Sequence, residues 1–265
     1  MKERPSFPAR LDFSIAKSKV NRPIAAHVHS ASLYPVMPLP TPVVSQGLGM
    51  DSLAVRQNMV RKLAGQGITD PLVLSAMATI ERHRFVDTAL VNQAYEDTSL
   101  PIGLGQTISK PGVVSRMVEL LCQGCNGKLG RVLEIGTGCG YQAAVLSLLA
   151  SEVYSMERLR GLHDKARDNL RHLRLRNLHL IYGDGMVGYA QGAPYAAIIA
   201  AAGGEPVPQA WIDQLTVGGR LVAPVFTGTN STKQQALLVI DKTPQGLRQT
   251  VLESVHFVPL KSGVA

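Results

Sequence analysis

Strands and helices alternate through the second half of this 265-residue chain, and that alternation constrains the fold more than any other feature. A strand joined by a helix to its neighbour pairs with it in parallel. Two final apolar runs have no clear helix between them, which predicts an antiparallel edge. The predicted fold is α/β, a doubly wound and mostly parallel sheet with helices on both faces. In chain order, the expected strands are 131–135, 152–156, 177–182, 196–200, 220–225, 235–240 and 249–258, and the expected helices are 141–149, 159–173 and 208–215.

The region before residue 131 is expected to be mainly helical. A helix capped by Asp51 or Ser52 ends near Gly65, and Asp70 followed by Pro71 is typical of the start of a second helix. This second helix is expected to bury Leu72, Leu74, Met77 and Ile80. A short segment at 85–95, a glycine-rich loop at 100–106 and a helix from Pro111 to Leu121 are expected to follow.

Residues 1–50 lack the periodicity of a helix or a strand. They contain seven prolines, and six basic residues stand against two acidic ones. Such a segment buries little apolar surface, so we expect a flexible, basic, proline-rich extension. The folded domain is expected to cover 51–265, with a helical subregion at 51–126 and the sheet at 127–265.

Composition and charge argue against nucleic-acid binding and against a membrane protein. The chain is 45% hydrophobic and carries a formal net charge of +8, half of which lies within residues 1–50. The remaining charge is spread thinly and aromatic residues do not alternate with basic ones, so no nucleic-acid partner is expected. No apolar run approaches the roughly 20 residues that span a bilayer. Because no secretory signal is recognised either, we expect a cytoplasmic protein that does not bind membranes.

Three cysteines are too few for a disulfide framework. Cys122 and Cys125 form a lone Cys-x-x-Cys pair, with no second pair and no nearby histidine. We therefore expect two reduced thiols and no metal site.

Residues 134–142, Glu-Ile-Gly-Thr-Gly-Cys-Gly-Tyr-Gln, follow an expected strand and begin an expected helix. Glycines at such a turn let the backbone approach a ligand closely. Their spacing differs from the Gly-x-Gly-x-x-Gly of dinucleotide sites. The acidic residue before them suits a ligand with an ammonium group and a ribose, and the pattern resembles motif I of S-adenosylmethionine-dependent methyltransferases. A nicotinamide enzyme, or glycines used only for packing, stay as alternatives. The candidate cofactor-binding residues here are Glu134, Gly136, Thr137, Gly138, Gly140 and Gln142.

Acidic residues also follow the next two expected strands. Glu157 stands 21 positions after Gly136, and a carboxylate there can accept hydrogen bonds from ribose hydroxyls. Asp184 lies between two glycines and can accept from an adenine amino group, with Gly185 beside it. An exposed glutamate paired with arginine, and a plain turn, are the alternatives. Three acidic sites at successive strand ends favour a nucleoside cofactor, because open α/β sheets bind ligands there.

The most specific signal lies upstream. Residues 95–111, Tyr-Glu-Asp-Thr-Ser-Leu-Pro-Ile-Gly-Leu-Gly-Gln-Thr-Ile-Ser-Lys-Pro, closely resemble a segment of protein-L-isoaspartate O-methyltransferases. Residues 82–86, 211–222 and 255–260 are similar to other stretches of that family. The resemblance covers residues 52–262.

The resemblance implies a Rossmann-like methyltransferase fold, with S-adenosyl-L-methionine as cofactor. It implies methylation of the α-carboxyl group of L-isoaspartyl residues in damaged proteins and peptides, followed by closure to a succinimide. The acceptor carboxylate is already ionised at pH 7, so no general base is needed. Ser109 is implied as the catalytic residue, and Gln106, Thr107 and Ile108 as substrate-binding residues beside it; from the residues alone, Ser109 also suits a helix N-cap. Residues 51–126 would form the substrate side and 127–265 the cofactor side of a monomer.

Several positions depart from the family's usual pattern. Lys-Pro-Gly at 110–112 stands where Gln-Pro-Tyr is usual, Cys139 replaces a serine, and His256 replaces an arginine. The fourth expected strand lacks an aspartate at Ala196, and the segment 200–204 is altered. Two alternatives therefore stay open: a methyltransferase for nucleic acids or small molecules, and a cofactor-binding protein of weakened activity.

Overall fold

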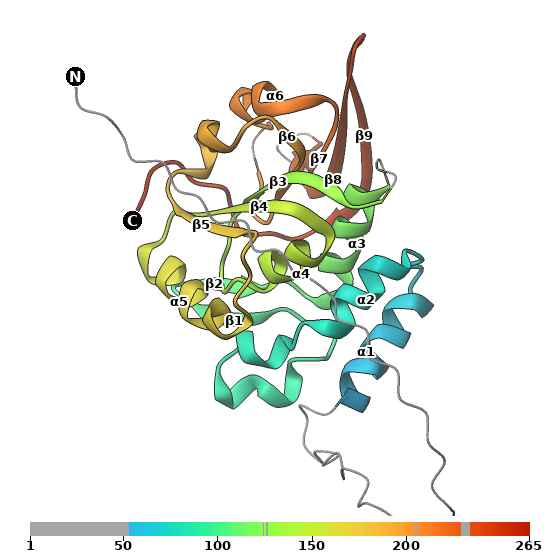
Figure 1. Cartoon of the computed structure of the whole chain (residues 1–265), viewed down its shortest axis with the longest axis vertical. Coiled ribbons are helices and arrows are strands. Elements are labelled where there is room, and N and C mark those ends of the chain that lie inside the picture. Colours follow the sequence, from blue (N-terminus) through green and yellow to red (C-terminus); the bar gives the residue numbers. More distant parts are fainter. Residues whose placement is uncertain (1–52, 124, 126, 205, 229–233) are drawn as a thin grey trace, which may run out of the picture. The chain divides into compact units, whose positions relative to one another are not determined.

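The computed structural model describes residues 53–265 except residues 124, 126, 205 and 229–233 (Figure 1). The extension expected at residues 1–50 and the cap expected at Asp51 or Ser52 lie outside the described residues. The described residues belong to one unit, Ser45–Ala265. Among them, no helix combines the length and the apolar character needed to cross a membrane.

Within the described residues, seven strands form the central sheet in the order β5-β4-β3-β6-β7-β8-β9 (Figure 1). The strands are β3 (Leu129–Ile135), β4 (Ala150–Glu157), β5 (Leu178–Tyr182), β6 (Tyr195–Ala200), β7 (Leu215–Thr227), β8 (Gln234–Thr243) and β9 (Gly246–Val255). Strands β3 to β7 pair in parallel, whereas β8 pairs with β7 and β9 in antiparallel register. The predicted fold class and its antiparallel edge are confirmed.

Helices cover both faces of this sheet (Figure 1). Side chains alternate along a strand, so Val132 packs toward one face and Leu133 toward the other. Helices α3 (Pro111–Cys122), α4 (Tyr141–Leu149) and α5 (Arg160–Leu170) lie on the Val132 face, and α6 (Gln209–Gln214) lies on the Leu133 face. The buried Trp211 of α6 donates its indole N–H to Gly185 O at 2.7 Å, which anchors the turn after β5.

Before the sheet come α1 (Leu53–Gly65) and α2 (Pro71–Thr79). Asp70 caps α2 as expected, because its Oδ1 accepts from the Leu72 and Val73 amides at 2.8 and 3.3 Å. The predicted inward face was wrong at Leu72, whose side chain is exposed. The buried row is Val73, Ala76, Met77 and Ile80. Nearly every position of α2 is apolar, so its sequence period does not single out one face.

The glycine-rich loop expected at 100–106 is instead a hairpin of β1 (Leu100–Gly103) and β2 (Gln106–Ile108). Leu104 has a φ of 52° at its tip, between two glycines that also have positive φ, and this conformation allows a tight turn. Lys165 of α5 donates to Ile102 O at 2.9 Å and holds the hairpin. The segment expected at 85–95 forms two short 3₁₀ turns, η1 (Arg82–Phe85) and η2 (Thr88–Gln93).

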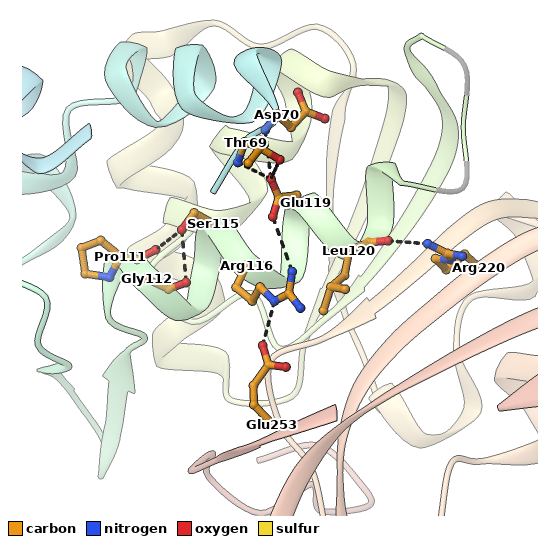
Figure 2. Close-up of polar contacts among 10 residues, drawn as sticks. All are labelled: Thr69, Asp70, Pro111, Gly112, Ser115, Arg116, Glu119, Leu120, Arg220 and Glu253. Carbon is orange, nitrogen blue, oxygen red and sulfur yellow. Dashed lines mark hydrogen bonds and ion pairs between the residues drawn. The ribbon is translucent and has the colours of Figure 1, made fainter. Parts of the chain in front are cut away.

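A polar network fixes α3 between the N-terminal helices and the sheet edge (Figure 2). The buried Glu119 Oε1 accepts from the Thr69 and Asp70 amides at 2.6 and 2.9 Å. Arg116 lies 3.5 Å from Glu119 Oε2 and 2.8 Å from Glu253 Oε1 of β9. Burial opposes ionisation of Glu119, but the hydrogen bonds from Asp70 and Thr69 and the charge of Arg116 keep its pKa below the ordinary value.

Candidate functional site

A cavity of about 450 Å³ lies at the carboxyl ends of the central strands. Its lining includes Gly136 after β3, Glu157 at the end of β4 and Ala201 after β6. The chain runs outward from β3 to β4 and β5 and then returns to β6 on the other side of β3. Ligands of open α/β sheets bind at such a reversal of strand order, so the topology places a ligand site here.

The loop after β3 forms one wall of the cavity through Gly136, Thr137 and Gly138. Gly136 and Gly138 have φ values of 91° and 57°, which glycine adopts without strain. Gly140 begins α4 and does not line the cavity; a β-carbon there would lie 2.8 Å from Leu170 Cδ1 of α5. We infer that Gly140 allows close helix packing, whereas the first two glycines shape the wall.

Glu157 lines the cavity and is 5% exposed. Its Oε2 accepts from the Gly138 amide at 2.9 Å, and its Oε1 accepts from the Leu159 amide at 2.9 Å. The carboxylate therefore ties the glycine loop to the start of α5. Each carboxylate oxygen has a further lone pair, so these bonds leave acceptor capacity for a ligand.

Glu134 lies beneath the cavity wall and is fully buried, so it does not line the cavity. Its Oε2 accepts from the Ser155 hydroxyl, whose oxygen is 2.6 Å from Thr137 Oγ1. Burial raises the pKa of Glu134 to about 8, against the opposing effect of the Ser155 hydrogen bond. The buried Gln142 amide faces Glu134 and also lowers its pKa, and Gln142 lines the cavity.

Asp184 does not line the cavity, although Gly185 does. Its Oδ1 accepts from the Met186 amide at 2.8 Å, and its Oδ2 accepts from the Gly263 amide at 2.6 Å. The carboxylate thus holds the segment after β9 against the turn after β5. Sequence spacing placed Asp184 at the correct strand end but could not show that residue 263 reaches it.

The hairpin forms another part of the cavity wall. Gln106, Thr107, Ile108 and Ser109 all line the first cavity, so the structure brings the substrate-side candidates beside the glycine loop. Ser109 and Thr107 also line a second cavity of about 560 Å³ between the start of α3 and the end of β9. Ser109 is half-buried where the two cavities meet.

Several lining residues are not among those predicted to bind cofactor or substrate. They include Ile102, Leu104, Arg158, Leu159, Ala201, Ala202, Val258, Pro259, Leu260 and Lys261. Two main-chain hydrogen bonds bring the last group to the site: Gly203 N donates to Val258 O at 3.0 Å, and Leu260 N donates to Gly203 O at 3.1 Å. The position of 200–204 after an expected strand placed that segment near the cofactor site, but no local pattern predicts that residues 258–261 cross to it.

The departures from the family pattern fall at different distances from the cavities. Ala196 does not line either cavity, and its methyl group faces Gly130. Cys139 lines the first cavity, where burial raises the pKa of its thiol to about 11. His256 lines the second cavity. Burial also raises the pKa of the Cys122 thiol to about 12, and no cluster of three metal-binding side chains occurs among the residues described.

The first cavity fits S-adenosylmethionine on three observations. Its volume is typical of small-molecule sites. Gly136 and Gly138 line it without side chains, so a ligand can approach their backbone closely. The Gln142 amide borders it, and so does the Glu157 carboxylate, whose remaining lone pairs suit hydroxyl groups. Fold and site together define the class of Rossmann-like, nucleoside-cofactor methyltransferases.

Comparisons with known proteins identify the family within that class. A sequence model of the protein-L-isoaspartate(D-aspartate) O-methyltransferase family matches residues 54–265. The chain is 53% identical over 268 residues to a protein-L-isoaspartate O-methyltransferase of Methylibium petroleiphilum, covering 98% of this chain and 96% of that protein. It is 58% identical over 226 residues to one of Leptothrix cholodnii, covering 84% and 79% of the two chains. The chain belongs to the protein-L-isoaspartate O-methyltransferase family.

Solved structures agree. A protein-L-isoaspartate O-methyltransferase with 27% identity superposes with a TM-score of 0.70 over 79% of this chain and 67% of that one. A Plasmodium falciparum structure of that enzyme type, in complex with S-adenosyl-L-homocysteine, has 22% identity and a TM-score of 0.67 over 78% and 98% of the two chains. The latter supports the fold alone.

Proposed function

We propose that this protein transfers a methyl group from S-adenosyl-L-methionine to the α-carboxyl group of L-isoaspartyl residues in damaged proteins. The observation that carries the proposal is 53% identity to a protein-L-isoaspartate O-methyltransferase across 98% of the chain. The resulting ester closes to a succinimide, and hydrolysis of that ring returns part of the residue to normal aspartate. The protein thereby begins a repair reaction.

The first cavity would hold the cofactor, which when bound supplies an electrophilic methyl group on a sulfonium. Glu157 would accept hydrogen bonds from the ribose hydroxyls with the lone pairs that the two main-chain amides leave free. Gly136, Thr137, Gly138 and Gly185 would offer main-chain contacts, and Gln142 would offer its side-chain amide. Glu134 would act from beneath by fixing Ser155 and Thr137. Asp184 would shape the rim by holding residue 263.

The second cavity would take the peptide around the isoaspartyl residue. Ser109 borders both cavities, so its hydroxyl can donate to the acceptor carboxylate while that group faces the cofactor. Because the carboxylate is ionised at neutral pH, the protein moves no proton. Its contribution is to hold the carboxylate oxygen in line and to exclude water. The hairpin residues Gln106, Thr107 and Ile108 would form the wall against which the peptide lies.

This assignment divides the domain by function. Residues 51–126 would supply the substrate side, including the hairpin and α3, and residues 127–265 would supply the cofactor side. We further propose that the enzyme acts as a cytoplasmic monomer on proteins and peptides, without a nucleic-acid or membrane partner.

Label transfer from methyl-labelled S-adenosylmethionine to matched isoaspartyl and aspartyl peptides tests the function. The isoaspartyl peptide should be labelled and its aspartyl twin ignored, since the free carboxylate is placed differently on the main chain. The label should be released as methanol in mild base, because the product is an ester with a neighbouring amide that attacks it. Base-stable label, or equal labelling of both peptides, would refute the repair function even if the cofactor binds.

A further inference from the structure

The N-terminus of α3 is capped by a residue that does not adjoin the helix in sequence. Lys110 occupies the N-cap position, where its side chain makes no capping hydrogen bond within the described chain, and Pro111 has no amide hydrogen. The first free amide of the helix is that of Gly112, and it donates to Asp97 Oδ1 at 2.6 Å. Asp97 therefore acts as the N-cap acceptor from 15 residues upstream.

The lack of a side chain at Gly112 permits this contact. A β-carbon built there would lie 2.9 and 3.0 Å from the two carboxylate oxygens of Asp97 and 3.2 Å from Gln66 Oε1. Lys110 Nζ lies 3.6 Å from Asp97 Oδ2, and Gln66 Nε2 donates to that oxygen at 3.5 Å. Gly112 is also a departure from the pattern that the resemblance implies at this position.

Ser109 lies between this contact and the end of the hairpin. The β1–β2 ladder ends at the pair Leu100–Ile108, one residue before Ser109. The next fixed point along the chain is the bond between Asp97 and Gly112, three residues after Ser109. Asp97 precedes the hairpin and Gly112 follows it, so their bond closes its base. The backbone of Ser109 is thus held from both sides, where the two cavities meet.

We propose that Asp97 is a positioning residue for Ser109 in methyl transfer, and that it acts by accepting the Gly112 amide hydrogen. The inference rests on the proposed function, because it assigns Ser109 to the acceptor carboxylate. Asp97 also faces Lys110 and lines the second cavity, so its charge and its acceptor oxygen must be separated experimentally, and KM for the peptide must be measured beside kcat.

Asp97→Ala and Asp97→Asn remove the same charge, but only the asparagine keeps an acceptor oxygen for Gly112. On an isoaspartyl peptide, Asp97→Ala should lower kcat by about tenfold, because small displacements of a reacting group cost up to about 100-fold in rate. Asp97→Asn should stay within about threefold of wild type, since the cap is retained. The Kd for S-adenosylhomocysteine should be the same in all variants, and Asp168→Ala, at an exposed ion-paired aspartate outside both cavities, is the control.

Gly112→Ala provides a second, independent measurement. In the wild-type background its methyl group would displace the Asp97 carboxylate and lower kcat. In the Asp97→Ala background the carboxylate is gone and only Gln66 Oε1, the end of a flexible side chain, lies close to the added methyl group, so kcat should not fall further. Such non-additivity is expected only if the two residues act through one contact.

Equal kcat values for Asp97→Ala and Asp97→Asn, or additive effects of Gly112→Ala, would overturn the inference while leaving the proposed function intact. A wild-type protein that binds S-adenosylhomocysteine but methylates no isoaspartyl peptide would overturn both.

Discussion

At the scale of single residues, replacing Ser109 tests the proposed mechanism most directly, because this residue borders both cavities. Ser109→Ala should lower turnover by roughly tenfold or more, since a hydrogen bond to a charged group contributes about 1.5–3 kcal/mol. The Kd for S-adenosylhomocysteine, measured by calorimetry, should be nearly unchanged. Ser75→Ala, at an exposed position of α2, is the matched control. A normal rate together with a lowered Tm would show that Ser109 stabilises the fold rather than orienting the carboxylate.

The raised pKa of the buried Glu134 leads us to expect that the free energy of unfolding depends on pH. Burial raises its pKa from 4.5 to about 8, so between these values the unfolded chain loses the proton while the folded protein keeps it. The folded state is therefore favoured most below about 4.5, and this advantage is lost as the pH rises to about 8. Without cofactor, wild-type protein should lose up to a few kcal/mol relative to Glu134→Gln across this range. Urea unfolding at several pH values measures this difference, and parallel curves for the two proteins would contradict the shift.

At the scale of elements, α3 connects the N-terminal helices, the sheet edge and the site (Figure 2). Glu119→Ala should lower the free energy of unfolding by about 2–4 kcal/mol, because the amides of Thr69 and Asp70 lose a charged acceptor that is itself buried. Glu253→Ala removes only the partly exposed partner of Arg116 and should cost at most about 1 kcal/mol. Denaturant unfolding compares the two variants, and equal losses would show that Glu119 does not anchor the helix.

At the scale of the whole molecule, the domain is expected to fold without residues 1–50. The family match begins at residue 54, and the buried core begins at Met59. Deleting residues 1–50 should shift the Tm by less than about 3 °C, which is about 1 kcal/mol in a domain of this size. The rate on a short isoaspartyl peptide should also be retained. A large loss of stability would mean that the extension packs on the domain.

The sequence alone determined the order and type of the main elements. Alternating strands and helices specified a parallel sheet, and the start of α2 at Pro71 and the span of α4 were predictable from caps and apolar runs. It also placed the glycine loop and Glu157 at strand ends that the sheet brings to one cavity. These features depend on local backbone preferences and on a topology rule, both of which short stretches of sequence express.

Only the tertiary structure decided which groups meet across the chain. Asp184 receives the amide of Gly263, and Glu134 lies buried beneath the wall rather than on it. Residues 258–261 complete the cavity, and Lys165 holds the hairpin that forms where a loop was expected at 100–106. Each outcome depends on burial or on a hydrogen bond between segments far apart in sequence. Spacing along a chain sets which strand end a side chain follows, but packing alone sets which partner is within reach of it.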